Sequence, residues 1–276
     1  MEVKSLRPLI IGGGNLGGAV ARGLFRAGVR PLVVQHRGVN FDGLQKDGIE
    51  VYETIEEALP LSGQSPVFLA LKPWLVCDYC AEHRLLLEGR VVVSCAALVS
   101  LSLLREAAPS AHWGRVMPNI ASAVGAGFTG VCRGDWSEEE LQCVCSLCGL
   151  FGDMMVVAEK DLDGIIGLSG SSIAYVFELL EGFMQGGLAV GMKGDLSLRA
   201  GIATLAGAAA LARESGRHPA ELKDSVCTPG GTTIAGIRAL QRSGFRSSFI
   251  EALVATVERS QAGSAAFLAA ARREKK

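Results

Sequence analysis

A glycine-rich turn near the N-terminus restricts the fold of this chain more than any other feature. An apolar run ends in the segment GGGNLG at 12–17, a helical pattern follows, and a second apolar run starts at Pro31. This order of strand, turn, helix and strand is the setting that a dinucleotide-binding motif requires. Within it, Gly12, Gly14 and Gly17 have the G-x-G-x-x-G spacing. The sequence therefore predicts an α/β domain that binds a dinucleotide.

Each glycine of the turn has its own physical role. Gly12 permits the tight turn, Gly14 lets the backbone approach a pyrophosphate, and Gly17 allows the helix to pack closely on the strand. The N-terminus of the helix also offers unpaired N–H groups to phosphate oxygens. A purely structural turn in a glycine-rich chain is the alternative, but the complete setting favours a Rossmann nucleotide site.

The end of the second strand indicates which nicotinamide cofactor binds. A site for NAD(H) places an acidic residue here, on the 2′-hydroxyl of the ribose. This chain has Gln35, His36 and Arg37 instead, and no acid before Asp42. The guanidinium of Arg37 suits a 2′-phosphate, and a solvated loop arginine is the plainer alternative. We predict NADP(H) in preference to NAD(H), with His36 and Arg37 as cofactor-binding candidates.

Strands and helices alternate as far as about residue 160. Alternation at this spacing predicts a parallel sheet. Ser137 is a candidate N-cap with Glu140 at the capping-box offset, which predicts a helix start there. The strand-like runs are 7–12, 31–34, 49–52, 66–71, 90–95 and 112–117, and a further strand–helix–strand group spans 127–157.

The second part of the chain has almost no strand signal. It consists of Ala-, Leu- and Gly-rich helical patterns at 163–192, 195–214, 231–242 and 245–272. We therefore predict a Rossmann domain over 1–160 and an all-α domain over 161–276.

Charge and hydropathy exclude several classes of protein. The 27 basic and 28 acidic residues nearly cancel, which argues against nucleic acid or an anionic membrane as a partner. Of the two most apolar stretches, 91–104 is too short to span a bilayer and 165–192 carries Glu178 and Glu181. The N-terminus has no secretory signal pattern. We expect a cytoplasmic protein.

Two cysteine pairs have metal-ligand spacing. Cys77 with Cys80 and Cys145 with Cys148 are both C-x-x-C pairs, and together they could supply four thiolates to zinc. Both pairs fall inside helical patterns and lack the glycine-rich knuckles of zinc sites. We expect ordinary reduced thiols and no metal.

A second glycine-rich turn lies in the helical part. The segment PGGTT at 229–233 leads into a helix, so its N–H groups and hydroxyls can form a cradle for an anion such as a carboxylate. Helix capping by a threonine is the alternative interpretation.

The segment HPAELKDSVCTPGGTT at 218–233 resembles the signature of the pyrroline-5-carboxylate reductases. Further matches run in order through nearly the whole chain: GGGNLG at 12–17, ALKP at 70–73, RVMPN at 115–119, GLSGSS at 167–172 and GFRSSFIEAL at 244–253. The resemblance implies NAD(P)H-dependent reduction of 1-pyrroline-5-carboxylate to L-proline. It also implies a Rossmann domain and a helical domain that intertwines with a partner subunit, in homodimers that assemble further into rings of five.

The resemblance assigns roles to residues of this sequence. For the pyrophosphate it implies Gly12, Gly14, Asn15, Leu16 and Gly17, and for the path to the nicotinamide Ala70, Lys72, Pro73 and Asn119. For the substrate it implies Thr228, Gly230, Gly231, Thr232 and Thr233 around the carboxylate, with Ser171 and Ser172 facing the ring.

Three departures from the family pattern lie in segments that the resemblance places near the nicotinamide or the substrate. Leu98 stands where the family has glycine, Ile120-Ala121 where it has Thr-Pro, and Ser172-Ile173 where it has Gly-Pro. A retuned reductase of a related cyclic imino acid, or an inactive NADP(H)-binding regulator, is therefore an alternative. A hydroxyacid dehydrogenase or related imine reductase is disfavoured, because its Gly-x-x-x-Asn-x-x-Lys helix is absent from 167–178.

The chemistry asks little of the protein beyond positioning, since the cofactor supplies the hydride. The imine nitrogen must be protonated, and the hydroxyl of Thr233 or Ser171 could hydrogen-bond to it. We name these two as catalytic candidates. None of the four histidines lies in the substrate loops. We expect structural or surface roles for them, with His36 also a cofactor-binding candidate because it precedes Arg37.

Overall fold

The chain folds into two compact units. The computed structural model describes residues 3–35 and 41–273. The first unit comprises Met1–Ser171 together with Thr256–Lys276, and the second comprises Ser172–Ala255. The end of the last helix thus belongs to the first unit by its contacts. The assignment of 161–276 to one functional domain stays a prediction.

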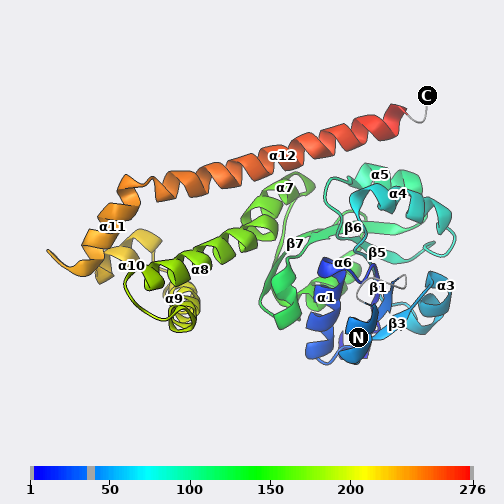
Figure 1. Ribbon diagram of the computed structural model, residues 1–276. Coiled ribbons are helices and arrows are strands. Elements are labelled where there is room, and N and C mark those ends of the chain that lie inside the picture. The colour runs from blue at the N-terminus through cyan, green and yellow to red at the C-terminus, as the bar shows by residue number, and fades with distance from the viewer. Residues whose placement is uncertain (1–2, 36–40, 274–276) are drawn as a thin grey trace. The chain divides into compact units, whose positions relative to one another are not determined.

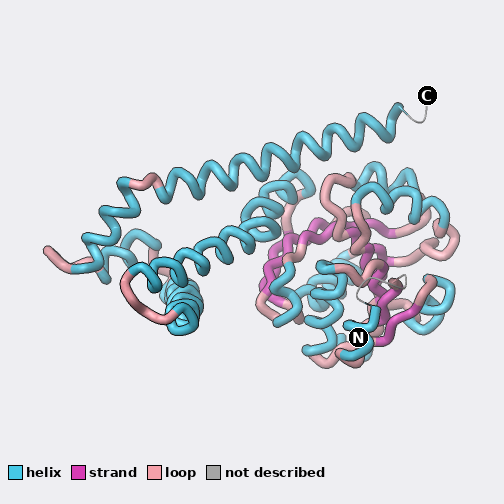
Figure 2. Tube along the Cα trace, viewed as in Figure 1, coloured by secondary structure: helices cyan, strands magenta, loops and turns pink. Residues whose placement is uncertain are grey.

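An eight-stranded sheet forms the centre of the first unit (Figures 1 and 2). Its strand order is β3-β2-β1-β4-β5-β6-β7-β8. The strands are β1 (Leu9–Ile11), β2 (Leu32–Val34), β3 (Glu50–Tyr52), β4 (Val67–Leu69), β5 (Val91–Ser94), β6 (His112–Met117), β7 (Gly127–Cys132) and β8 (Gly152–Val156). Strands β1 to β6 are parallel, and the chain order reverses beside β1, which pairs with both β2 and β4. Ligands of open α/β sheets bind at such a switch point.

The prediction of a parallel sheet is wrong at one pair of strands. Strand β7 runs antiparallel to β6, with Val116 opposite Val131. The connection holds only a 3₁₀ helix, Ile120–Val124, whereas a parallel crossover needs a dozen or more residues. Strand β8 is again parallel to β7, because helix α6 (Glu138–Gly149) connects them. Ser137 and Glu140 form the predicted capping box at the start of α6.

Helices cover both faces of the sheet and bury two hydrophobic cores. Because side chains alternate along a strand, Leu9 and Ile11 lie in one core and Ile10 lies in the other. Trp113 fills the first core and Trp136 the second, both almost fully buried. The remaining helices of this unit are α1 (Asn15–Arg26), α2 (Phe41–Lys46), α3 (Ile55–Ala58), α4 (Pro73–Glu82), α5 (Leu101–Ala107), α7 (Leu162–Ile165) and a π-helix, Ile166–Ser171.

The second unit consists of helices alone. They are α8 (Ser172–Ala189), α9 (Gly194–Ser215), α10 (Pro219–Val226), α11 (Thr232–Arg242) and the first part of α12 (Phe245–Arg273). Every residue of 172–255 is described, and among them only Ser172, Ser197 and Gly201 are buried. Helices α8 and α9 cross closely at Gly187. A Cβ added at this glycine would lie 1.9 Å from the hydroxyl of Ser197.

Two helical stretches of the chain are strongly apolar. By length and composition alone, Glu159–Ala189 and Gly194–Ser215 could cross a membrane, and the apolar window of each is largely exposed in the structure. A helix whose apolar face is covered by a partner subunit has the same character. The exposed large apolar side chains of these helices are Leu168, Val176, Phe177, Phe183, Leu188, Leu196, Ile202 and Leu211.

Candidate active site

The glycine turn between β1 and α1 has the geometry that its sequence predicts. Gly12 has a φ of +101°, and a Cβ there would lie 2.7 Å from the carbonyl oxygen of Ala70. At Gly17 a Cβ would lie 1.9 Å from the carbonyl oxygen of Gly12, so helix and turn meet backbone to backbone. A Cβ at Gly14, by contrast, would meet nothing within 4 Å. Gly14 therefore borders open space, where a pyrophosphate can approach.

A cavity of about 490 Å³ opens from this turn within the first unit. This volume suits a small-molecule cofactor. Its lining includes many of the cofactor residues expected from sequence, namely Gly14, Asn15, Leu16, Ala70, Lys72, Pro73 and Asn119. Their roles in binding stay a prediction, but the structure brings them together around one space.

Sequence reasoning gave no individual role to another group of residues that line this cavity, although most of them lie in the three segments that it expected near the nicotinamide or the substrate. They are Leu71, Cys95, Ala96, Ala97, Met117, Pro118, Ile120, Ile166 and Gly170. Cys95 follows β5 directly, and Pro118 follows β6. The rule that ligands bind at the carboxyl ends of parallel strands could have found them.

Gln35 is a further residue that the sequence left without a role. Its side-chain carbonyl accepts a hydrogen bond of 2.5 Å from the backbone N–H of Gly13. The donor fixes the orientation of the amide, because only the oxygen can accept. Gln35 thus ties the end of β2 to the glycine turn. His36 and Arg37 lie outside the described residues.

The amide of Asn119 is fully engaged within the first unit. Its oxygen accepts from the N–H of Ala121 at 3.1 Å, and its nitrogen donates to the hydroxyl of Ser169 at 2.9 Å. Asn119 therefore caps the 3₁₀ helix and holds the π-helix Ile166–Ser171 against the cavity rim. Ser171 ends this π-helix, and Ser172 is the buried first residue of α8.

The five predicted residues of the carboxylate site lie together in the second unit, in the turn before α11. Gly230 has a φ of +69° and Gly231 has no room for a Cβ, which would lie 2.2 Å from the hydroxyl oxygen of Thr228. Gly231 is the N-cap of α11, and no side chain caps this helix. The alternative interpretation, in which Thr233 is a helix cap, is therefore wrong. The N–H groups of the first turn and the hydroxyls of Thr232 and Thr233 can face an anion.

The histidines that the structure describes have other partners. His83 stacks on Tyr79, His112 pairs with Glu140 at 2.7 Å, and His218 caps α10. None of these three lines the cofactor cavity.

The cysteine pairs lie on helices, Cys77 with Cys80 on α4 and Cys145 with Cys148 on α6. None of the eight cysteines forms a disulfide, and no metal-ligand group of three or more side chains forms among the described residues. Burial raises the pKa of Cys80 and of Cys95 to about 12, so both stay neutral thiols.

Two family models match the chain. Residues 9–98 match the family described as coenzyme F420-dependent NADP oxidoreductase, and residues 159–263 match the family described as pyrroline-5-carboxylate reductase dimerisation.

Relatives and solved structures agree with these matches. The chain is 37% identical over 258 residues to a pyrroline-5-carboxylate reductase of Glycine max, covering 91% of this chain and 93% of the relative. It is 33% identical over 259 residues to the enzyme of that name from Escherichia coli, covering 91% of this chain and 96% of that one. A Coxiella burnetii pyrroline-5-carboxylate reductase superposes with a TM-score of 0.81 at 26% identity, covering 94% of this chain and 98% of that one. A Plasmodium falciparum pyrroline carboxylate reductase with NADP bound has the same fold, with a TM-score of 0.85 at 22% identity, covering 95% and 99% of the two chains.

Proposed function

The chain belongs to the pyrroline-5-carboxylate reductase family, and we propose that it reduces 1-pyrroline-5-carboxylate to L-proline, the last step of proline biosynthesis. The observation that carries the proposal is the open space at Gly14. The turn is closed tightly at Gly12 and Gly17 and left free at the one glycine that a pyrophosphate must approach.

The residues around the cavity fit a nicotinamide dinucleotide. When bound, NADPH supplies a hydride from C4 of its nicotinamide ring. Backbone N–H groups of Gly14, Asn15 and Leu16 lie at the start of α1, where they would hold the pyrophosphate. Lys72, which lines the same cavity, would add a positive charge on the path to the nicotinamide. Residues after β5 and β6 form the half of the cavity that would hold the nicotinamide nucleoside.

NADPH is the cofactor that the end of β2 favours. Gln35 commits its carbonyl to Gly13, so its remaining amide group can donate to a phosphate but places no negative charge near one. An acidic residue at the same place would accept from a ribose hydroxyl and repel a 2′-phosphate. Arg37 would add a bidentate donor.

The turn before α11 would hold the substrate. Its N–H groups and the hydroxyls of Thr228, Thr232 and Thr233 are suited to a carboxylate, with Gly230 and Gly231 allowing close approach. Charge-assisted hydrogen bonds at a helix N-terminus would fix the imino acid in one orientation. The hydroxyl of Ser171 or Thr233 would donate a hydrogen bond to the imine nitrogen, which takes up a proton as the carbon of the C=N bond accepts the hydride.

The active form that we propose is a homo-oligomer. The match to the dimerisation domain and the exposed apolar helices support a homodimer, and the family resemblance supports rings of five dimers. We propose a cytoplasmic location, which the lack of disulfides among the eight cysteines supports, because a reducing compartment keeps thiols reduced.

The test is turnover by the purified protein. With pyrroline-5-carboxylate present, we expect stoichiometric oxidation of NADPH and formation of proline. A parallel titration measures cofactor affinity without substrate. NADPH binding without any turnover would refute the proposed reaction and leave a cofactor-binding regulator.

A further inference from the structure

Arg115 is a buried arginine that the reaction as described does not use. It lies on β6 with an exposed fraction of 7%. One guanidinium nitrogen, Nη2, donates to the carbonyl oxygen of Ala96 at 3.2 Å, and Nη1 donates to the Oε1 of Glu159 at 3.0 Å. Burying a guanidinium carries a large desolvation cost, and an apolar side chain of similar volume usually packs at least as well. Packing alone therefore does not explain an arginine here.

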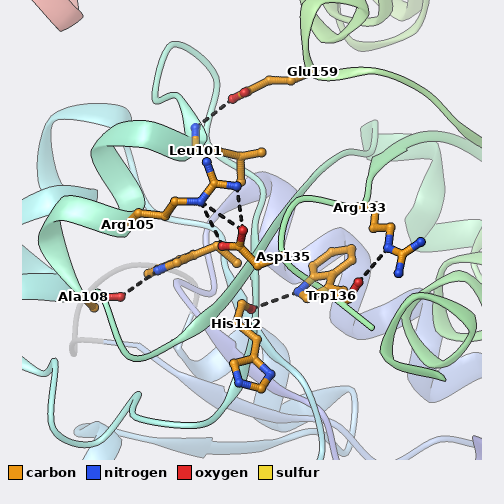
Figure 3. Close-up of polar contacts among 9 residues, drawn as sticks. Leu101, Arg105, Ala108, His112, Arg133, Asp135, Trp136 and Glu159 are labelled. Carbon is orange, nitrogen blue, oxygen red and sulfur yellow. Dashed lines mark hydrogen bonds and ion pairs between the residues drawn. The ribbon is translucent and has the colours of Figure 1, made fainter. Parts of the chain in front are cut away.

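Both acceptors of Arg115 act on the connection between β5 and α5. Ala96 lies on that connection, and the same Oε1 of Glu159 accepts from the N–H of Leu101, the first residue of α5, at 2.7 Å (Figure 3). Ser100 is the N-cap of α5 but makes no capping bond with its side chain. Glu159 takes over that role. The connection is thus held near both its ends by one ion pair.

The middle of the connection is held by Leu98. Among the described residues it is the one side-chain-bearing residue with a positive φ, at +69°. Its side chain packs on Gly263 of α12, within the same unit, where an added Cβ would lie 3.0 Å from Cδ2 of Leu98. Such a conformation persists only where the surroundings determine it.

This connection is also a wall of the cofactor cavity. Cys95, Ala96 and Ala97 line the cavity on the side of β5 and β6, away from the glycine turn. The glycine turn holds the pyrophosphate, so the wall governs where the other end of the cofactor lies. We propose that Arg115 is a positioning residue for hydride transfer, which fixes the wall Cys95–Ala97 through Ala96 and Glu159. This rests on the proposed function.

The test compares Arg115→Met with Arg133→Met. Arg133 lies in the same unit, half-exposed, and pairs with Glu138 and the carbonyl of Trp136. Because a displacement of about 1 Å can cost about a hundredfold in rate, we expect Arg115→Met to lower kcat by about tenfold or more. The dissociation constant of NADPH should change by less than about threefold, because the turn that holds the pyrophosphate is intact. Arg115→Lys, which keeps one donor, should recover part of kcat.

The fluorescence of bound NADPH gives a readout that needs no turnover. Emission reports the surroundings of the nicotinamide ring, so Arg115→Met should shift its intensity and lifetime while Arg133→Met should not. Unchanged emission and kcat in folded Arg115→Met would overturn the proposal, as would losses that Arg133→Met reproduces. If Arg115→Met does not fold, Arg115→Lys decides by the same two measurements. An inactive wild type would refute the proposed function, and the emission would still decide the role of Arg115.

Discussion

The two units of this chain obtain their stability in different ways. The cofactor unit buries two cores, one on each face of its sheet, and its tryptophans Trp113 and Trp136 are almost fully enclosed. The helical unit buries only small residues and leaves Phe177, Phe249 and Ile250 substantially exposed. A single copy therefore encloses cores in its cofactor unit, whereas its helical unit buries no large apolar side chain. We infer that the apolar helices are one half of a core that a second copy supplies, since soluble monomers rarely expose so much apolar surface.

Breaking the shared core should give the largest effect. Phe249 is 40% exposed and packs edge-to-face on Tyr175 beside a cavity of about 650 Å³ in the helical unit. In a symmetric dimer each subunit carries the substitution Phe249→Asp, so the interface contains two added charges. The dimer dissociation constant should therefore rise by about a thousandfold or more. Analytical ultracentrifugation would measure this. Leu85→Asp is the matched control, because Leu85 is 77% exposed in the cofactor unit, and the mass of that variant should not change.

Gly14→Val should affect cofactor binding and leave the fold intact. The added side chain meets open space in the free protein but occupies the approach of the pyrophosphate. The affinity for NADPH should fall at least tenfold, about 1.4 kcal/mol. Gly17→Ala is the counterpart, because its Cβ would collide with the carbonyl of Gly12 and should lower the melting temperature. A Gly14→Val variant that binds NADPH normally would contradict the assignment of this turn as the pyrophosphate-binding site.

Thr233→Ala in the helical unit should affect the substrate and leave cofactor binding unchanged. Losing one charge-assisted hydrogen bond to the substrate carboxylate costs about 1.5–3 kcal/mol, so kcat/KM for pyrroline-5-carboxylate should fall about tenfold or more. The affinity for NADPH should hardly change, because the cofactor cavity belongs to the first unit. Steady-state kinetics with a cofactor titration measure both. A variant with unaltered kcat/KM would leave the turn before α11 without a substrate role.

The smallest predicted effect is electrostatic and confined to the cofactor unit. Hydrogen bonds from Arg105, at 2.7 to 3.1 Å, hold the pKa of Asp135 below its usual range (Figure 3). A carboxyl whose pKa is lower in the folded than in the unfolded state stabilises the protein at pH values above its unfolded-state pKa. This contribution to stability is lost as the pH falls through the folded-state pKa. Because the pair is partly exposed, Asp135→Asn should cost at most about 1 kcal/mol at pH 7. Melting temperatures should converge with those of the wild type below about pH 4.

The sequence predicted the features that depend on local pattern. The glycine turn, the capping box at Ser137 and the long helices follow from spacing and periodicity, and the structure agrees with them. It missed features that depend on long-range contacts. The reversal of β7 depends on the length of its connection, and the hydrogen bonds of Arg115 to Ala96 and Glu159 join residues that are distant in sequence.

The departures from the family pattern have different structural settings. Leu98 replaces a glycine at a positive φ, which explains why glycine is usual there, and Gly263 makes room for its side chain. Ile120 lines the cofactor cavity. Nothing in the structure explains Ile173.

The most direct test of the account measures activity and NADPH binding on the same sample over a range of protein concentrations. Our account predicts that specific activity falls as the oligomer dissociates, while the amount of NADPH bound per chain stays constant. Phe249→Asp should show this behaviour at higher concentrations than the wild type. A monomer with full specific activity would contradict the claim that the helical unit is completed by a second copy.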